Sequence, residues 1–403
     1  MKIVNFKEII SKSIGGIRSV YFVCGFGLSS WAPLVPFAKE RLALDEAGLG
    51  LLLLLLGAGA IIMMPISGIL GQRYGNRIVI ALSSLLLAIA LPFLAFLDSR
   101  ILMGLSLFLF GAGVGTVDVA MNSVGVHIQN LHSKPIMSSF HGLFSLGGLF
   151  GSIGVGILLK MGLEPLVAAI CISILVIATV GFQYNKLFDK ATEKATAIKN
   201  DDSEIPKQAI RFSWLHPGVL FFGILCFIVF MVEGAVLDWS ALYLRENRGM
   251  NEVWAGLGFA TFSVAMAIMR LLGDRIVEKL SSVAVVTGGS LIAALGLILV
   301  IMAPTLPVSI AGFFILGCGA ANIVPVFFNE AGRLKGISTS MAVSAISTLG
   351  YSGMLLGPVG VGLVAQISSL ATAFAFAATL LAGVGVLYLF YISAKKNKKT
   401  NNL

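Results

Sequence analysis

The chain reads Gly111-Ala-Gly-Val-Gly-Thr-Val-Asp-Val-Ala-Met-Asn122 inside an apolar run that extends from Ile101 to Val126. Such a run can cross a bilayer as one helix, since about 20 apolar residues suffice. Asp118 lies well inside it, where an ionised carboxylate costs about 3 kcal/mol unless it meets protein, water or a partner. Asn122 follows one turn later on the same face, and the glycines before it allow a helix or ligand to approach. We expect both side chains to serve a solute or proton pathway; the alternative is that Asp118 only joins neighbouring helices.

The composition indicates a membrane protein. Hydrophobic residues make up 57% of the 403 residues and charged residues only 12%, about half the charged fraction of soluble domains. We therefore expect an all-α integral membrane protein. Apolar runs of spanning length predict twelve transmembrane helices, near 17–38, 48–71, 77–97, 101–126, 136–159, 165–185, 217–242, 253–272, 282–303, 308–330, 339–365 and 370–393.

The basic residues predict the orientation. We expect the spans to lie in the inner (plasma) membrane with both termini in the cytoplasm. In this orientation most of the 28 Lys and Arg residues are cytoplasmic. Six lie on the opposite side: Lys39, Arg41, Arg100, Lys160, Arg245 and Arg248. The net charge of +9 is then explained by topology and anionic lipid, so no nucleic-acid partner is expected.

Cysteine and histidine spacing gives no sign of a metal or cofactor. Four cysteines lie singly in separate predicted spans, with neither a CxxC pair nor a Cys–His cluster: Cys24, Cys171, Cys226 and Cys318. We therefore expect no metal site and no cofactor. The sequence also offers no nucleophile–base pair for an enzyme and no large soluble domain for a receptor.

A polar stretch divides the chain. Residues 186–216 mix both signs of charge with few large apolar side chains, which is typical of a linker. We expect a six-helix half at 1–185, a cytoplasmic linker at 186–216, a second six-helix half at 217–394 and a basic cytoplasmic tail at 395–403.

The two halves repeat. Landmarks of the first half recur in order in the second: Trp31 and Ala47-Gly-Leu-Gly50 as Trp239 and Ala255-Gly-Leu-Gly258, Gly71-Gln-Arg73 as Gly273-Asp-Arg275, Gly111-Ala-Gly113 as Gly317-Cys-Gly319, and Ser145-Leu-Gly147 as Thr348-Leu-Gly350. An even number of spans gives both halves one orientation. Parallel repeats with a central site between them are a transporter architecture.

The loop after the second predicted span carries a family motif. It reads Gly68-Ile-Leu70-Gly71-Gln72-Arg73-Tyr74-Gly75-Asn76-Arg77. Together with the repeat, it makes the whole chain resemble the major facilitator superfamily, whose motif here is Gly-x-Leu-(Ala/Gly)-Asp-Arg-x-Gly-Arg-(Lys/Arg). Gln72 replaces the Asp, while the second half keeps Asp274-Arg275 and has Arg270 for the first Gly. The resemblance implies a cytoplasmic gate formed by Gly68, Arg73, Gly75, Arg77, Asp274 and Arg275; the alternative is that these are turn residues that set orientation.

Two further stretches resemble the fucose-permease branch of bacterial members. They read His141-Gly-Leu-Phe-Ser-Leu-Gly147 and Asp238-Trp-Ser-Ala-Leu-Tyr243. That branch uses a carboxylate of the fourth span for proton coupling, and Asp118 falls on the corresponding stretch. Its acidic residue in the first span has no counterpart in 18–38 of this chain. A histidine side chain ordinarily titrates near neutrality, so His141 is expected either to exchange a proton with Asp118 or to be an interfacial hydrogen-bonding residue.

Polar and aromatic residues within the spans predict a substrate cavity. Trp rings stack on C–H surfaces and amides bind hydroxyl groups, as is common in sugar carriers. The candidates are Asn122, Glu233, Asp238, Trp239, Trp31 and Asn322. For the two Trp residues, the alternative is a belt position at the membrane interface.

The sequence therefore predicts a monomeric secondary transporter that couples uptake of a small polar, sugar-like solute to protons by alternating access. The alternative is proton-linked efflux of an amphipathic compound. Many such exporters carry an Arg four residues before the glycine stretch of the fourth span, which begins at Gly111 here, and this chain has Leu107 at that position. The exporter pattern Gly-x-x-x-Gly-Pro occurs only as Gly353-Met-Leu-Leu-Gly357-Pro358, where we expect tight helix packing.

Overall fold

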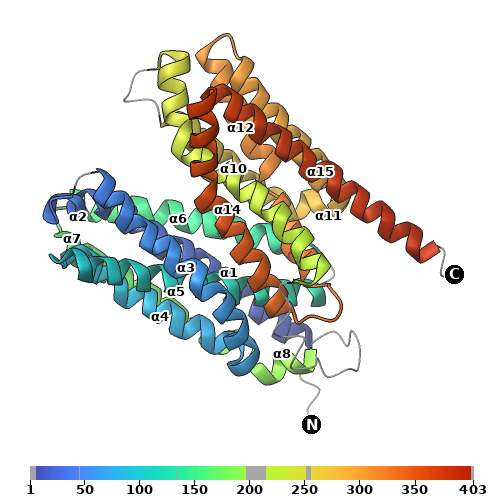
Figure 1. Ribbon diagram of the computed structural model, residues 1–403. Helices are drawn as coiled ribbons and strands as arrows, with labels where there is room; N and C mark the ends of the chain where they lie inside the picture. The colour runs from blue at the N-terminus through green and yellow to red at the C-terminus, as the bar shows by residue number, and fades with distance from the viewer. Residues whose placement is uncertain (1–5, 45, 133, 197–214, 251–255, 401–403) are drawn as a thin grey trace. The chain divides into compact units, whose positions relative to one another are not determined.

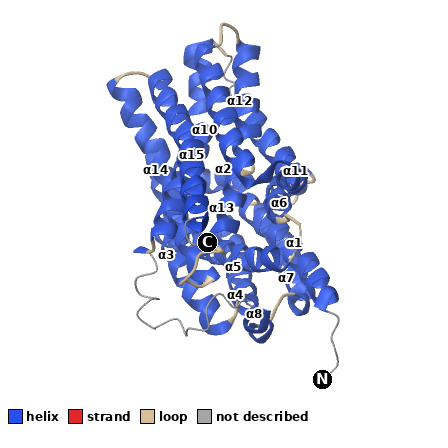
Figure 2. Cartoon of the chain, turned by 90° about the vertical axis from the view of Figure 1, so that its right-hand side faces the viewer, coloured by secondary structure: helices blue, strands red, loops and turns tan. Residues whose placement is uncertain are grey.

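The computed structural model describes residues 6–44, 46–132, 134–196, 215–250 and 256–400 (Figure 1). Among these residues the chain forms helices and loops and no strand, as Figure 2 shows. The first-half helices are α1 (Phe6–Ser29), η1 (Ala32–Leu34), α2 (Val35–Arg41), α3 (Glu46–Tyr74), α4 (Asn76–Phe96), α5 (Arg100–Leu131), α6 (Met137–Lys160), α7 (Pro165–Gln183), η2 (Tyr184–Lys186) and α8 (Lys190–Thr196). The remaining helices are α10 (Pro217–Arg248), α11 (Leu257–Met302), α12 (Leu306–Ala320), α13 (Ile323–Ala331), α14 (Thr339–Ile367) and α15 (Leu370–Thr400).

The chain forms two compact units. The first unit comprises Met1–Ser133, Leu143–Val219 and Ala331–Thr348, and the second comprises Lys134–Gly142, Leu220–Glu330 and Leu349–Leu403. Helices α6 and α14 each contribute their first turns to one unit and the rest of their length to the other. The sequence repeat is visible here too, because both helices change units at matching positions of the two halves.

Large apolar side chains face outward as well as inward. Ile101 and Phe182 expose 84% and 75% of their surface, whereas the polar Ser67 and Asn122 are fully buried. An apolar exterior around polar buried groups suits a lipid environment, in which every backbone polar group is satisfied inside its own helix. In the described part of the chain, 11 helices are long and apolar enough to cross a membrane. The predicted all-α, multi-pass membrane architecture is thus confirmed.

One residue interrupts the longest helix. α11 contains 46 residues, and Ser281 within it has a positive φ of 70°. The Ser281 hydroxyl accepts a hydrogen bond from the Ala284 N–H at 3.5 Å, as an N-cap does at the start of a new helix. The predicted spans 253–272 and 282–303 fall on either side of this break. Residues 253–255, including the Ala255 of the repeat, lie outside the described residues.

The glycines of the opening stretch bring helices of the first unit into close contact. A Cβ atom at Gly111 would overlap the carbonyl oxygen of Leu56 in α3, and one at Gly115 would lie 2.6 Å from that of Ala60. Only glycine permits α5 and α3 to pack this closely. The expected tight packing at Gly353 is also confirmed, because its Cβ atom would overlap a backbone carbonyl of α10.

Two arginines cap matching helix ends in the two halves. Arg41, at the end of α2, donates to the carbonyl oxygen of Leu94 at 2.8 Å near the end of α4. Arg248, at the end of α10, donates to the carbonyl oxygens of Val300 and Ile301 at 3.0 and 2.6 Å near the end of α11. A cation at a helix C-terminus satisfies unpaired carbonyls and complements the helix dipole.

We predict that Arg248→Met lowers the free energy of unfolding by about 2 kcal/mol, because two carbonyl groups lose a charged donor while the apolar stem is kept. Thermal unfolding of the detergent-solubilised protein measures this effect. Arg245→Met on the same helix is the control, since the Arg245 side chain is 49% exposed. Equal melting temperatures for the two variants would contradict the capping role.

Candidate functional site

A polar centre lies inside the first unit. Asp118 and Asn122 on α5 are 6% and 0% exposed, and Tyr21 on α1 is fully buried beside them. The Tyr21 hydroxyl donates to Asn122 Oδ1 at 2.8 Å, and Asn122 Nδ2 donates to the Asp118 carbonyl oxygen at 2.9 Å. The structure therefore brings Asp118 and Asn122 together, as their helical spacing predicts.

Tyr21 is the member of this centre that sequence reasoning missed. Its hydroxyl and the thiol of Cys24 both lie within electrostatic range of the Asp118 carboxyl group. A buried tyrosine needs a partner for its O–H, so a single Tyr in an otherwise apolar span was an available signal. This centre contains a carboxyl group, which can take up and release a proton. Beside it lie a hydroxyl group and an amide that are already oriented by hydrogen bonds.

A second polar centre lies inside the second unit. Glu233 on α10 and Arg270 on α11 form an ion pair of 3.3 Å between Oε1 and Nη2, and each side chain is only 12% exposed. Arg270 Nε also donates to the carbonyl oxygen of Ala321 at 3.2 Å. Ala321 lies at the break between α12 and α13, within the predicted span 308–330. Arg270 was noted in the sequence only as a departure from the loop motif.

Asn322 occupies the same break. Its Nδ2 donates to the carbonyl oxygen of Met269 at 3.0 Å, and the residue is 4% exposed. Its Oδ1 is buried over Gly273 and has no hydrogen-bond partner among the described residues. Interrupted helices with polar groups at the break are typical of binding sites in transporters. Asn322 and Glu233 were predicted separately. Glu233 pairs with Arg270, and Asn322 bonds the carbonyl oxygen of Met269, the residue before Arg270.

His141 belongs to the second unit. It lies on α6, its ring centroid is 5.8 Å from that of Phe328, and it is within electrostatic range of Arg270. Asp118 belongs to the first unit. A proton exchange between His141 and Asp118 stays a prediction.

The remaining cavity candidates differ in their surroundings. Trp239 Nε1 donates to the carbonyl oxygen of Pro358 at 2.9 Å, so its indole N–H is already engaged with α14. Asp238 is exposed. Trp31 is 5% exposed, and among the described residues its Nε1 has no hydrogen-bond partner.

The loop between α3 and α4 contacts the beginning of α14 within the first unit. Gln72 donates to the Ser338 hydroxyl, and Asn76 Nδ2 donates to the Ser340 hydroxyl at 3.4 Å. Gln72 thus makes a neutral hydrogen bond at the position where the family motif has an acid. Neighbouring Asn76 adds a second one.

Among the predicted gate residues of this loop, the glycines allow close packing and a turn, and the arginines lie over aromatic rings. A Cβ atom at Gly68 would lie 2.6 Å from a side chain of α14, and Gly75 turns the chain into α4 with a φ of 88°. Arg73 is exposed over the ring of its neighbour Tyr74. Arg77 stacks on the ring of Tyr184 at 4.5 Å.

The equivalent loop of the second half contacts the beginning of α6 within the second unit. Asp274 Oδ1 accepts a hydrogen bond from the Ser139 N–H at 3.1 Å. Lys134 and Glu278 form an ion pair of 2.9 Å beside it, while Arg275 is exposed. Each loop of the repeat therefore engages the first turn of a later helix, with Asp274 in one half and Gln72 in the other.

A short helix in the predicted linker docks on the first of these loops. Glu193 of α8 accepts hydrogen bonds from the N–H and Nδ2 of Asn76, each at 3.3 Å, where α4 begins. Lys190 Nζ donates to the Arg73 carbonyl oxygen at 2.8 Å. Burial raises the pKa of Glu193 to about 7, although the Asn76 hydrogen bonds and Arg77 act in the opposite direction. Residues 197–214 of the linker lie outside the described residues.

We predict that α8 undocks as the pH rises from 6 to 8. The docked state holds a proton on Glu193 that the undocked helix releases, so docking is strongest below the ordinary glutamate pKa and weakens as the pH passes about 7. The docking equilibrium changes by at most about tenfold per pH unit. Hydrogen exchange of residues 186–196, corrected for the intrinsic pH dependence, measures it. In Glu193→Gln the pH dependence should vanish; its persistence would assign the effect to another group.

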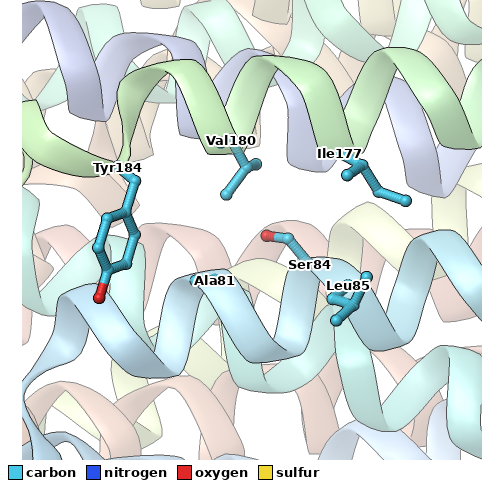
Figure 3. Close-up of a pocket in the computed structure, with 7 residues that line it drawn as sticks. Ala81, Ser84, Leu85, Ile177, Val180 and Tyr184 are labelled. Carbon is cyan, nitrogen blue, oxygen red and sulfur yellow. The ribbon is translucent and has the colours of Figure 1, made fainter.

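An apolar crevice of about 340 Å³ lies between α4 and α7 (Figure 3). Its side chains come from both helices, with Tyr184 at one end and Ile177 at the other. Leu85 and Ile177 are 40% and 43% exposed on the apolar exterior. None of the predicted site residues lines it, so this crevice is separate from both polar centres.

Comparisons with known proteins agree with the family motif. Residues 19–336 match the model of the Major Facilitator Superfamily. The chain is 41% identical over 364 residues to an uncharacterised MFS-type transporter of Yersinia pestis, covering 90% of this chain and 92% of that one.

Two solved structures show the same fold. The fucose:proton symporter FucP of Escherichia coli is 18% identical and superposes with a TM-score of 0.71, over 93% of this chain and 97% of that one. The human organic anion transporter MFSD10 is 15% identical and superposes with a TM-score of 0.75, over 94% of this chain and 99% of that one.

Proposed function

Because the chain belongs to the major facilitator superfamily of membrane transporters, we propose that it carries a small polar, sugar-like solute across the bacterial inner membrane together with a proton. The proposal draws its solute class from the hydrogen-bonding groups inside the two polar centres and from the fold shared with a fucose:proton symporter. Alternating access, in which the binding residues open to one side of the membrane at a time, moves the solute.

The observation that carries the coupling is the buried carboxyl group of Asp118, which is 6% exposed on a membrane-spanning helix. An ionised carboxylate is costly there, so proton uptake and release change the relative stability of the outward-open and inward-open states. Asp118 takes a proton from outside and releases it inside. Tyr21 and Asn122 position this centre, and His141 is the proposed relay.

The cavity residues bind the solute. Asn122 and Asn322 offer amides for hydroxyl groups, and Glu233 and Asp238 offer carboxylates. Trp31 and Trp239 supply ring faces for C–H surfaces. Trp31 Nε1 and Asn322 Oδ1 have no hydrogen-bond partner among the described residues, which supports this assignment, since buried polar atoms normally have partners.

The two motif loops form the cytoplasmic gate. Gly68 and Gly75 allow the close approach and turn of the first loop, and Asp274 holds the second loop to the start of α6. The exposed guanidinium groups follow the loops at the cytoplasmic surface: Arg73, Arg77 and Arg275. Solute release inside requires these contacts with α6 and α14 to open.

The topology completes the proposal. The 46 residues of α11 amount to about 69 Å of helix at 1.5 Å per residue, twice what a bilayer needs, and they are divided at Ser281, so α11 supplies two spans and brings the total to twelve. These form two parallel six-helix halves, 1–185 and 217–394, joined by the linker 186–216. The protein is a monomer, with both termini and the tail 395–403 in the cytoplasm.

Proton-coupled flux in liposomes tests the function. Purified protein is reconstituted around a pH-sensitive dye, and sugars, amino acids, organic acids and lipophilic cations are added in turn. We predict that a polar solute moves protons with the wild type and not with Asp118→Asn, because the amide cannot carry a proton. Asp98→Asn is the matched control, since that side chain is 81% exposed.

Each outcome has a clear meaning. Solute movement that ignores both the pH gradient and Asp118→Asn would contradict proton coupling. If only lipophilic cations move protons, and the protons move in the direction opposite to the cation, the protein is a proton-linked exporter and not an uptake system.

A further inference from the structure

The second polar centre contains a charge that the proposed coupling does not use. Arg270 is 12% exposed within a membrane-spanning helix, and its guanidinium stays protonated at every physiological pH. Glu233, its ion-pair partner, is equally buried and can lose its charge by taking a proton. A buried cation with a partner that can be neutralised is suited to exchange that partner for another anion.

The geometry of the pair leaves room for a better acceptor. Glu233 and Arg270 meet through one hydrogen bond of 3.3 Å, whereas a strong arginine–carboxylate pair is bidentate with N–O distances of about 2.8 Å. Arg270 Nε is held by the Ala321 carbonyl oxygen at the break between α12 and α13. The hydrogen bond to the break thus helps to hold the guanidinium group in place independently of Glu233.

The repeat supplies an internal comparison. Glu233 corresponds to Gly25 of the first half, and Arg270 corresponds to Gly68. Gly25 packs against the backbone of α6, and Gly68 packs against α14, without a charged group. The corresponding positions of the first half are thus uncharged and each packs against a later helix, so the repeat does not require an ion pair there, which argues against a purely structural role for the charges in the second half.

We propose that Arg270 binds the carboxylate of an anionic solute and that Glu233 occupies the guanidinium group when the solute is absent. This inference rests on the proposed function and narrows its solute class to a small polyhydroxy acid. Two carboxylates cannot both stay ionised beside one buried guanidinium, so the displaced Glu233 takes one proton as the solute binds. The solute then enters as an anion accompanied by a proton, and no net charge is added to this centre.

The neighbouring groups limit what else can titrate there. Cys226 on α10 lies within electrostatic range of Glu233, and His141 on α6 lies within electrostatic range of Arg270. Neither carries negative charge at neutral pH. Glu233 is the carboxylate that is paired with Arg270, at 3.3 Å, and the solute replaces it there.

Equilibrium binding by the purified full-length protein tests the proposal. The probes are D-gluconate, D-glucuronate and D-glycerate, each compared with its uncharged counterpart: sorbitol, D-glucose and glycerol. We expect wild type to bind at least one acid more tightly than its counterpart, and more tightly at pH 6 than at pH 8. Arg270→Gln should weaken binding of that acid by about 30-fold or more. Glu233→Gln should bind the acid at least as well as wild type, with a smaller pH dependence.

A double variant guards against misfolding. Arg270→Gln alone leaves Glu233 without its cation, whereas Glu233→Gln with Arg270→Gln removes both charges and leaves two uncharged polar side chains. It should fold and lose the preference for acids. If wild type binds no acid better than its counterpart, or if the double variant keeps the preference, the proposal is wrong.

The two proposals fail differently. If neutral sugars drive Asp118-dependent proton movement and acids do not bind, the proposed function stands and the role of Arg270 is wrong. If acids bind through Arg270 but cause no Asp118-dependent proton movement, the role of Arg270 stands and proton coupling through Asp118 is wrong.

Discussion

The structure depends on the cost of placing a charge inside an apolar helix bundle. Only 12% of the residues are charged, yet Asp118, Glu233 and Arg270 are buried on membrane-spanning helices. Each such group costs several kcal/mol unless it has partners, so it persists where the protein uses it. Glu233 and Arg270 meet this cost as an ion pair, whereas Asp118 lies in a polar cluster in which Tyr21 donates to Asn122 and Asn122 donates to the Asp118 backbone carbonyl oxygen.

The two halves share a scaffold and differ in their chemistry. Both place a capping arginine, Arg41 or Arg248, at matching helix ends, and both attach a motif loop to the first turn of a later helix. Their polar centres do not match: the first half has an acid on its fourth span, and the second has an ion pair between its first two. The repeat therefore keeps the frame in both halves, while the polar groups inside each half differ.

Sequence reading located the fold better than the site. Apolar periodicity indicated the helices and spacing placed Asn122 beside Asp118, because both depend on local order. The contact between Tyr21 and Asn122 joins residues that are 101 positions apart, and the Arg270–Ala321 contact depends on a helix break, so neither follows from spacing. The sequence indicated the break at Ser281 only through the lengths of the two apolar runs on either side of it. The capping roles of Arg41 and Arg248 were hidden because both were read as markers of orientation.

The most direct test of the account is whether a proton gradient alone drives accumulation. Proteoliposomes receive an inward proton gradient with no solute gradient, and labelled solute from the transport panel is counted inside. Since one pH unit is worth about 1.4 kcal/mol, wild type should concentrate the solute up to about tenfold per unit. Asp118→Asn should exchange labelled solute without concentrating it. Accumulation by Asp118→Asn, or simple equilibration by wild type, would contradict proton coupling through Asp118.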